Sequence, residues 1–325
     1  AFSRFLSAFE DQEGNVPPKE GSWCSFTRSS FRCNEHRCWA DSSCAWFQTD
    51  AVTAVIFSDR LRRTQMTTVK GFCSFTPAQV LVVLQDGSSG SDVPSHFLSC
   101  RLITARLGDI EDHLRALGFK PESICAAHIE TKRNPHFPPP SWDSDYKHHI
   151  CANHLRFYLG YFPIFKNHAR VIFVDDDVVV RRNPAELYKT ELEPTVLITA
   201  NCDVNIWNNK CQRFDVAFSD YFHFWNLSEA TTTAYAELDS VLAEAGAPKY
   251  DRTHPEWNFG FNLFNLDLHR ELNFSHMYER LAAAMLEHKL VRADSLFYGL
   301  GAPFLAYQQR VQCYNRRGWD VVDGL

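Results

Sequence analysis

The sequence lacks several features that would mark other classes of protein. Its longest apolar runs, such as VLVVL at 80–84, fall far short of the roughly 20 residues that a membrane-spanning helix needs. The net charge of −6, from 33 basic and 39 acidic residues, does not supply the basic field that general nucleic-acid binding requires. The 14 glycines and 15 prolines among 325 residues are too few for a linker or a collagen-like chain. A content of 45% apolar residues indicates a globular protein with a sizeable core.

Short cysteine pairs of the kind found in zinc sites are also nearly absent. Four of the 11 cysteines lie near the start of the chain, at Cys24, Cys33, Cys38 and Cys44, and only Cys33 and Cys38 come close to a zinc spacing. This spacing favours disulfides, with unpaired thiols and a metal site as the alternatives. Because cysteine is abundant, we expect the protein to fold in an oxidising compartment. Residues 1–51 are predicted to be a Cys-rich N-terminal extension or stem.

The rest of the chain, residues 52–325, is predicted to be one α/β domain. Apolar runs typical of buried strands alternate with amphipathic segments typical of helices, which favours a sheet with helices on both faces. The predicted strands are 52–57, 80–84, 170–174, a short 178–180, 195–200 and 259–266. The predicted helices follow Asp59 up to about 72, then 108–118, 148–162, a helix ending at about 188, 229–245, 275–288 and 293–300.

The most informative motif is an acidic triplet between two apolar runs. Asp175, Asp176 and Asp177 follow VIFV and precede VVV. Three adjacent carboxylates repel each other, and a divalent cation would relieve the repulsion. Side chains alternate along extended chain, so Asp175 and Asp177 would share a face and offer hard oxygen ligands to Mn²⁺ or Mg²⁺. The carboxyl end of a buried strand is also where open α/β sheets bind ligands.

Two other interpretations of the triplet are weaker. A solvated acidic turn without a ligand is one, although such turns are uncommon between apolar strands. A phosphotransferase of the haloacid dehalogenase type is the other, but Val178-Val179 stands where a Gly-Thr pair is usual. The chain also has no G-x4-GK-[ST] loop for nucleotide phosphates.

The ordered set of motifs resembles glycosyltransferase family 8, in particular its plant galacturonosyltransferase branch. The segment HLRFYLGYFPIFKNHARVIFVDDDVVVRRNPAELY (154–188) carries the HLRFYL and DDDVVV motifs of that branch in the same order. VIFSD (55–59), LVVLQD (81–86), NFGFNLFNLDLHRE (258–271) and RGWDVVDGL (317–325) resemble other segments of the family. The resemblance covers residues 52–325.

This resemblance implies a GT-A fold, with a Rossmann-like nucleotide-binding mixed sheet flanked by helices. It implies transfer of a sugar from a UDP-sugar donor, with retention at the anomeric carbon, in a Mn²⁺-dependent reaction. Asp175 and Asp177 would be metal ligands, and the metal would bridge both phosphates of UDP. Asp176 would lie nearer the sugar or ribose.

Four further residues receive roles from the resemblance, each with a plain structural alternative. Arg156 would contact the donor, or form a surface ion pair on its helix. Ser58 and Asp59 would reach the uracil–ribose end, or Asp59 would cap the next helix. Asn258 would contact the transferred sugar, or occupy a turn, although the galacturonosyltransferase branch usually has a small apolar residue there.

Asp294 is the candidate for the position beside the anomeric centre, where a retaining reaction needs a nucleophile or a shielded attack. Its alternative role is to cap a helix that starts near Ser295. Asp267 is interpreted as a structural cap for the helix that follows it. Trp142, Trp207 and Trp257 are candidate contacts for a glycan acceptor, with burial in the core as the alternative.

The resemblance also implies features that we expect outside the sequence. The third metal ligand of the family is a histidine in an H-x-x-G-x-x-K-P-W segment, which we expect beyond residue 325. The chain begins with Ala1, and we interpret it as a fragment of a Golgi-lumen or secretory-pathway protein whose membrane anchor precedes it. The alternative function is that of an inactive homologue, a scaffold or anchor for an active transferase. Two sequons, at Asn226 and Asn273, are compatible with a luminal protein but are no more than chance would give.

Overall fold

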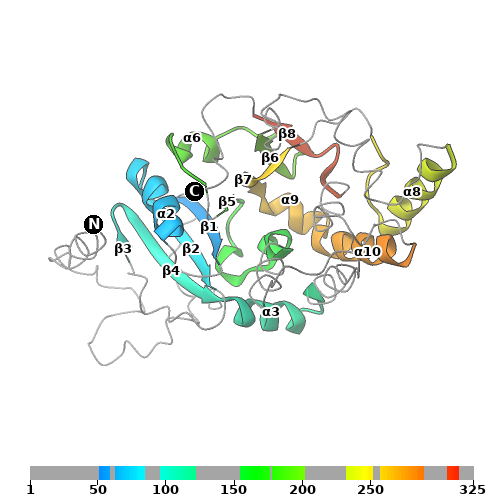
Figure 1. The fold of residues 1–325 in the computed structure, drawn as a ribbon, viewed down its shortest axis with the longest axis horizontal. Helices are drawn as coiled ribbons and strands as arrows, with labels where there is room; N and C mark the ends of the chain where they lie inside the picture. The colour runs from blue at the N-terminus through cyan, green and yellow to red at the C-terminus, as the bar shows by residue number, and fades with distance from the viewer. Residues whose placement is uncertain are drawn as a thin grey trace, which may run out of the picture.

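The computed structural model describes residues 51–58, 63–84, 96–121, 154–175, 178–201, 232–251, 257–288 and 306–314. Within these ranges the chain forms an eight-stranded sheet flanked by helices (Figure 1). The strands are β1 (Val52–Ser58), β2 (Ala78–Leu84), β3 (His96–Phe97), β4 (Cys100–Arg106), β5 (Arg170–Val174), β6 (Ile198–Asn201), β7 (Asn258–Asn265) and β8 (Val311–Cys313). The helices are α2 (Arg63–Phe75), α3 (Leu107–Ala116), α6 (Pro184–Tyr188), α8 (Thr232–Ala245), α9 (Leu266–Glu271) and α10 (Phe274–Glu287), with the 3₁₀ segments η3 (Leu155–Tyr161) and η4 (Pro163–Phe165).

The sheet is mixed, because β7 runs antiparallel to both of its neighbours and β3 runs antiparallel to β4. The strand order is β3-β4-β2-β1-β5-β7-β6-β8. Strands β4, β2, β1 and β5 are parallel, whereas β7 runs antiparallel to both β5 and β6. The carboxyl end of β5 therefore lies beside the amino end of β7, with Val174 opposite Phe261. The sheet edge at the end of β5 is thus built from segments far apart in the chain.

Alternation along the strands divides the core between the two faces of the sheet. In β1, Ala54 and Ile56 pack with α2 and α6, whereas Val55 and Phe57 pack with the cluster that contains α3, η3, α9 and α10. All seven residues of β2 are buried, as expected for a parallel strand covered on both faces. These contacts confirm the predicted α/β fold with helices on both sides of a mixed sheet.

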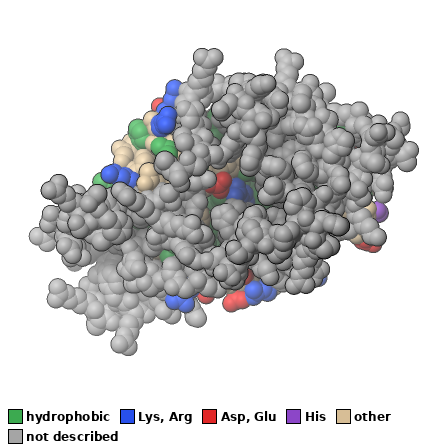
Figure 2. Space-filling model, viewed as in Figure 1, with side chains coloured by type: hydrophobic (Ala, Val, Ile, Leu, Met, Phe, Trp, Pro, Cys, Tyr) green, Lys and Arg blue, Asp and Glu red, His purple; other side chains and the backbone are tan. Residues whose placement is uncertain are grey.

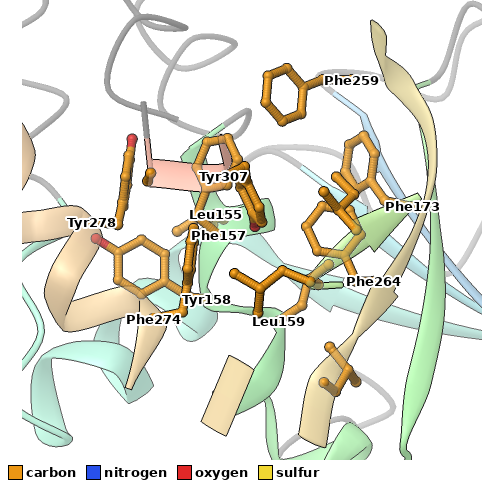
Figure 3. Packing of buried hydrophobic residues seen from close by; sticks show 14 of the residues in the cluster. Leu155, Phe157, Tyr158, Leu159, Phe173, Phe259, Phe264, Phe274, Tyr278 and Tyr307 are labelled. Carbon is orange, nitrogen blue, oxygen red and sulfur yellow. The ribbon is translucent and has the colours of Figure 1, made fainter. Parts of the chain in front are cut away.

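The 3₁₀ segment η3 fills the space between the sheet and α10. Figure 3 shows Leu155, Phe157 and Tyr158 of η3 among Phe274 and Tyr278 of α10 on one side and Phe173 and Phe264 of the sheet on the other. The ring centroids of Phe157 and Tyr278 lie 4.8 Å apart, and those of Phe157 and Phe259 lie 5.8 Å apart. This aromatic packing holds η3 in place, and η3 carries Arg156.

The predicted helix over 148–162 is described from His154 onward, where η3 is a 3₁₀ helix and not the α-helix that the apolar spacing indicates. Two carbonyls that an α-helix would bond internally are taken by side chains instead. Ser275 Oγ donates to the Phe157 carbonyl over 2.6 Å, and Arg270 Nη1 donates to the Gly160 carbonyl over 3.3 Å. Pro163 has no N–H to offer the Leu159 carbonyl, so the helical ladder ends there.

The predicted short strand at 178–180 is also absent, because these residues form irregular chain. The Val178 carbonyl accepts from Thr68 Oγ1 of α2 over 2.8 Å instead of joining a strand. The cap of α9 was assigned to the wrong residue as well: Asn265 is the N-cap and its side chain accepts from Leu268 N, while Asp267 lies in the first turn and pairs with Arg270.

Some elements lie outside the described ranges or escaped the sequence analysis. The predicted helix at 293–300 and the N-terminal extension 1–51, apart from Ala51, lie outside those ranges. The strands β3, β4 and β8 were not predicted, and α9 was anticipated only through the cap assigned to Asp267. No helix in the described part of the chain combines the length and the apolar character that crossing a membrane requires.

Candidate functional site

An ion pair at this edge of the sheet joins Arg156 of η3 to Asp175, the residue after β5. Arg156 Nη2 donates to Asp175 Oδ1 over 3.0 Å, and Nη1 donates to the Phe259 carbonyl over 2.8 Å. The guanidinium carbon also lies 4.0 Å from the centroid of the Phe173 ring. Figure 2 shows acidic and basic side-chain atoms against each other near the middle of this face.

The two partners differ sharply in exposure. The Arg156 side chain is 4% exposed, while that of Asp175 is 32% exposed. The alternative of a surface ion pair for Arg156 is therefore wrong, because the guanidinium is buried. A buried guanidinium persists only when its N–H groups and charge are satisfied, and a carboxylate, a carbonyl and an aromatic face do so here. Arg156 thus fixes the Asp175 carboxylate, and part of that carboxylate stays accessible to solvent.

The backbone around Asp175 is fixed from both sides. Asp175 N donates to the Gly260 carbonyl over 2.7 Å, which extends the pairing of β5 with β7 by one residue. Val178 N donates back to the Asp175 carbonyl over 3.3 Å. These bonds set the direction in which the chain leaves the strand. Asp176 and Asp177 lie outside the described residues, so their predicted alternation with Asp175 stays a prediction.

Helix α2 supports the segment that follows the triplet. Besides the bond from Thr68 to the Val178 carbonyl, Gly71 lies so close to this segment that a Cβ there would stand 3.2 Å from the Val180 carbonyl oxygen. Both Val178 and Val180 are buried against α2. The sequence analysis missed Thr68 because a threonine in an amphipathic helix carries no signal for a contact 110 residues away.

Register places two more predicted residues at this edge through their backbones. Ser58 is the last residue of β1, and Ile56 is opposite Val174 in the neighbouring β5, so β1 and β5 end together. Asn258 is the first residue of β7, which starts where β5 ends. The structure therefore brings the chain at Ser58, Asp175 and Asn258 to one edge of the sheet. Asp59 and Asp294 lie outside the described residues.

Of the three tryptophans predicted to contact a glycan acceptor, Trp257 lies within the described residues. Trp257 is 4% exposed, and its ring packs edge-on against Phe259 at a centroid distance of 5.6 Å. The alternative of core packing is therefore the right one for Trp257. Trp142 and Trp207 lie outside the described ranges, and their roles stay predictions.

A buried histidine that the sequence analysis did not single out anchors the start of η3. His154 Nδ1 lies 2.5 Å from Tyr278 Oη, and the rings are stacked at a centroid distance of 6.2 Å. Burial, aided by the positive charge of Arg156, lowers the pKa of His154 to about 4, so the ring is neutral near pH 7. Burial raises the pKa of Tyr278 well above its usual range. The pair is an uncharged link between η3 and α10.

The residues at the edge fit part of a divalent-cation site. A partly exposed carboxylate at the carboxyl end of a strand, backed by a fixed guanidinium, can present an oxygen to a hard cation. No group of three or more His, Cys, Asp or Glu side chains suited to a metal occurs within the described ranges, from which Asp176 and Asp177 are missing. Asp175 is thus the described member of the predicted ligand set.

Comparison with known proteins identifies the family. The family model described as "Glycosyl transferase family 8" matches residues 122–300, more than half of the chain. The chain belongs to glycosyl transferase family 8. The predicted family is confirmed, and the match includes Arg156, Asp175, Asn258 and Asp294, whereas Ser58 and Asp59 precede it.

Family 8 relatives in plants match this part of the chain. "Probable galacturonosyltransferase 4" from Arabidopsis thaliana is 27% identical over 197 residues, which is 61% of this chain and 26% of the relative. "Hexosyltransferase GAUT11" from the same plant is 27% identical over 163 residues, which is 48% of this chain and 25% of the relative. The chain thus spans about a quarter of the length of the curated relatives it matches.

Solved structures give a looser likeness. The galactosyltransferase LgtC, in complex with donor and acceptor sugar analogues, superposes over 81% of this chain and 73% of its own. The sequences are 14% identical and the TM-score is 0.44, too low to support any inference. The GT-A arrangement of this family 8 chain rests on the mixed sheet itself, with its antiparallel β7 beside the parallel strands.

Proposed function

We propose that the chain is the catalytic part of a retaining glycosyltransferase that transfers a sugar from a UDP-sugar to a glycan or polysaccharide acceptor, with Mn²⁺ as cofactor. The observation that carries the proposal is the Arg156–Asp175 pair. A buried guanidinium and a partly exposed carboxylate meet at the edge of the sheet where ligands bind in α/β folds, within the family 8 segment.

The partly exposed Asp175 carboxylate suits a divalent cation, which in turn can bind a nucleotide diphosphate. Asp175 and Asp177 would hold the cation, and Asp176 would lie nearer the sugar or ribose. Bound there, Mn²⁺ would supply a Lewis acid that stabilises the charge on the departing diphosphate. Arg156 holds the Asp175 carboxylate in place, so the ligand does not have to be ordered when the donor binds.

The remaining candidates take roles around the transferred sugar and the nucleoside. Ser58 and Asp59 would contact the uridine, because β1 ends beside β5. Asn258 at the start of β7 would contact the sugar, and Asp294 would lie beside the anomeric carbon. The buried disulfide between Cys73 and Cys100 supports a site of action in the Golgi lumen or elsewhere in the secretory pathway.

Calorimetric titration of UDP tests the proposal, with Mn²⁺ and then with EDTA. Asp175→Asn keeps the shape and one acceptor oxygen for Arg156 but removes the negative charge. We expect UDP binding that requires Mn²⁺, and at least about tenfold weaker binding to Asp175→Asn, or about 1.4 kcal/mol. Asp267→Asn is the matched control, since Asp267 also pairs with an arginine, Arg270, but away from the proposed donor site.

Hydrolysis of UDP-sugars by the same protein then identifies the donor, and the anomeric configuration of the released sugar shows retention or inversion. UDP binding without turnover of any UDP-sugar or acceptor would favour the scaffold role. Absence of UDP binding in the longer protein that contains this chain would overturn the transferase proposal.

A further inference from the structure

The corner between α9 and α10 exposes an asparagine in an unusual backbone conformation. Glu271, Leu272 and Asn273 are exposed in succession. Asn273 has φ of 50°, a left-handed conformation that asparagine and aspartate tolerate better than other non-glycine residues. Its carbonyl accepts from His276 N and Met277 N, which starts α10. The corner is therefore fixed by backbone bonds even though its side chains face solvent.

The two ends of the Asn273 amide have different surroundings. Tyr161 Oη donates to Asn273 Oδ1 over 2.7 Å. The Nδ2 nitrogen makes no hydrogen bond within the part of the chain that the structure describes. Since the hydroxyl of Tyr161 binds the oxygen, the fold leaves the nitrogen available to carry a substituent.

Asn273 is the first residue of the sequon Asn273-Phe274-Ser275, and the chain carries evidence of an oxidising environment. Cys73 and Cys100 form a disulfide between α2 and β4, and each is 1% exposed. Cys313 is disulfide-bonded as well. In the secretory location proposed above, a chain that forms disulfides also meets the oligosaccharide-transfer machinery. We propose that Asn273 is an N-glycosylation site.

The modification is compatible with the contacts that hold the corner. Asn273 Nδ2 forms a bond to C1 of an oligosaccharide carried on a lipid diphosphate, the bond from C1 to the diphosphate oxygen breaks, and the amide nitrogen loses one proton. The lipid diphosphate leaves with the bonding electrons. Oδ1 stays a carbonyl oxygen, so the bond from Tyr161 is kept.

The rest of the sequon restricts when this reaction can occur. Ser275 is 1% exposed and its hydroxyl donates to the Phe157 carbonyl, while Phe274 is fully buried. The sequon must present its third-position hydroxyl to be read. Once α10 packs against η3 this hydroxyl is committed, so glycosylation precedes that packing.

The attached glycan leaves the Arg156–Asp175 edge clear. Tyr161 is at the opposite end of η3 from Arg156, which lies at the start of that segment. Arg270, three residues before Asn273, donates to the His168 carbonyl, just ahead of the amino end of β5, whereas Asp175 follows its carboxyl end. We therefore expect a glycan at Asn273 not to change the affinity for UDP.

The test secretes the full chain from eukaryotic cells behind a cleavable signal and removes glycans with a peptide N-glycosidase in ¹⁸O water. The enzyme converts a glycosylated asparagine to labelled aspartate, which peptide mass spectrometry locates. We expect label at position 273. Asn273→Asp keeps an acceptor for Tyr161 and tolerates the left-handed backbone, so it should fold, bind UDP as before and lose one glycan on gels. Asn226→Asp is the control for the second sequon.

Secreted, folded protein without label at position 273 would overturn the proposal. A second arm adds lipid-linked oligosaccharide and transferase to unmodified protein, either folded or reduced and unfolded. We expect transfer only to the unfolded chain, and equal transfer to both forms would refute the order of events. Ser275→Thr, which preserves the sequon, should still be glycosylated.

Discussion

Arg156 and Asp175 form an ion pair in which the cation is buried and the anion is about a third exposed, 4% against 32%. This asymmetry distinguishes the pair from an ordinary salt bridge. The protein surrounds the guanidinium with a carbonyl and an aromatic ring, and leaves the carboxylate facing the sheet edge. The arrangement stabilises a negative charge at a surface where the rest of the acidic triplet would otherwise repel it.

Replacing Arg156 should therefore weaken UDP binding, and by more than the loss of unfolding free energy would explain. Arg156→Met keeps much of the length but removes both hydrogen bonds, and we expect UDP affinity in Mn²⁺ to fall by at least about tenfold. The cost in unfolding free energy should lie below the 3–5 kcal/mol typical of broken buried pairs, because Asp175 can rehydrate. Urea unfolding and calorimetry on the same samples measure both.

Arg270→Met is the matched comparison for Arg156→Met. Arg270 donates to the carbonyls of Gly160, Phe165 and His168 and pairs with Asp267, so its loss should also destabilise the fold. It lies away from Asp175, and UDP affinity of the folded protein should be unchanged. Equal losses of affinity in both variants would show that the Arg156 effect is merely structural.

Thr68→Val tests whether α2 supports the segment after the triplet. The change is nearly isosteric but leaves the buried Val178 carbonyl without its donor, which should cost about 1–3 kcal/mol of unfolding free energy. Mn²⁺-dependent UDP binding should weaken as well, because Val178 directly follows the triplet. Thr68→Ser should restore both properties. Ser74→Ala removes a comparable hydroxyl bond on an exposed turn of α2 and should be nearly neutral in urea unfolding.

Acid should weaken the fold through two buried histidines. Burial lowers the pKa of His154 to about 4 and that of His269 to about 3, in each case with a smaller contribution from a neighbouring arginine. Both folded values lie below the unfolded value of about 6.5, so the unfolded state binds more protons as the pH falls through 6.5. Stability is present above pH 6.5 and is lost toward pH 4.

Each histidine should remove about 2 kcal/mol between pH 7.5 and pH 5. Urea unfolding at these two pH values measures the loss. His154→Asn places a polar atom near the position of Nδ1 for Tyr278 and does not titrate, so its stability should change less with pH than that of the unaltered chain. An identical pH dependence in both proteins would contradict the assignment.

The disulfide between Cys73 and Cys100 should contribute substantially to stability. It closes a loop of 27 residues, for which chain entropy gives about 3–4 kcal/mol. The double variant Cys73→Ala with Cys100→Ala should lose about this amount in urea unfolding at pH 7. The variant is preferable to a reducing agent because Cys313 is also disulfide-bonded. A loss below about 1 kcal/mol would mean that the unfolded chain is already compact in this region.

The sequence predicted the central strands well for a physical reason. β1, β2 and β5 are covered on both faces, so nearly every residue is apolar and the signal is strong. β4 has the same surroundings over its middle, but exposed Arg101 and Arg106 near its ends interrupt the apolar run. η3 has apolar residues at helical spacing, yet side chains from α9 and α10 took its carbonyls, and no local pattern reports that.

The candidate site was predictable as a location but not as a set of contacts. An acidic triplet after a buried strand pointed to the carboxyl edge of a sheet, and Asp175 lies there. Its pairing with Arg156, and the support of the Phe259 carbonyl and the Phe173 ring, depend on how η3 packs between the sheet and α10. The two hydrogen bonds of Arg156 are set by tertiary structure, over separations of 19 and 103 residues.

The position of β5 in the sheet has a consequence for the order of folding. β1, α2, β2 and β4 follow one another closely in the sequence, so their parallel pairing closes short loops. Strand β5 must find β1 across a far longer stretch, and β7 must then find β5. Since long loop closures are slow, we expect the β1–β4 half to nucleate folding and β5 and β7 to join it later. The edge that carries Asp175 is then among the last parts of the protein to form.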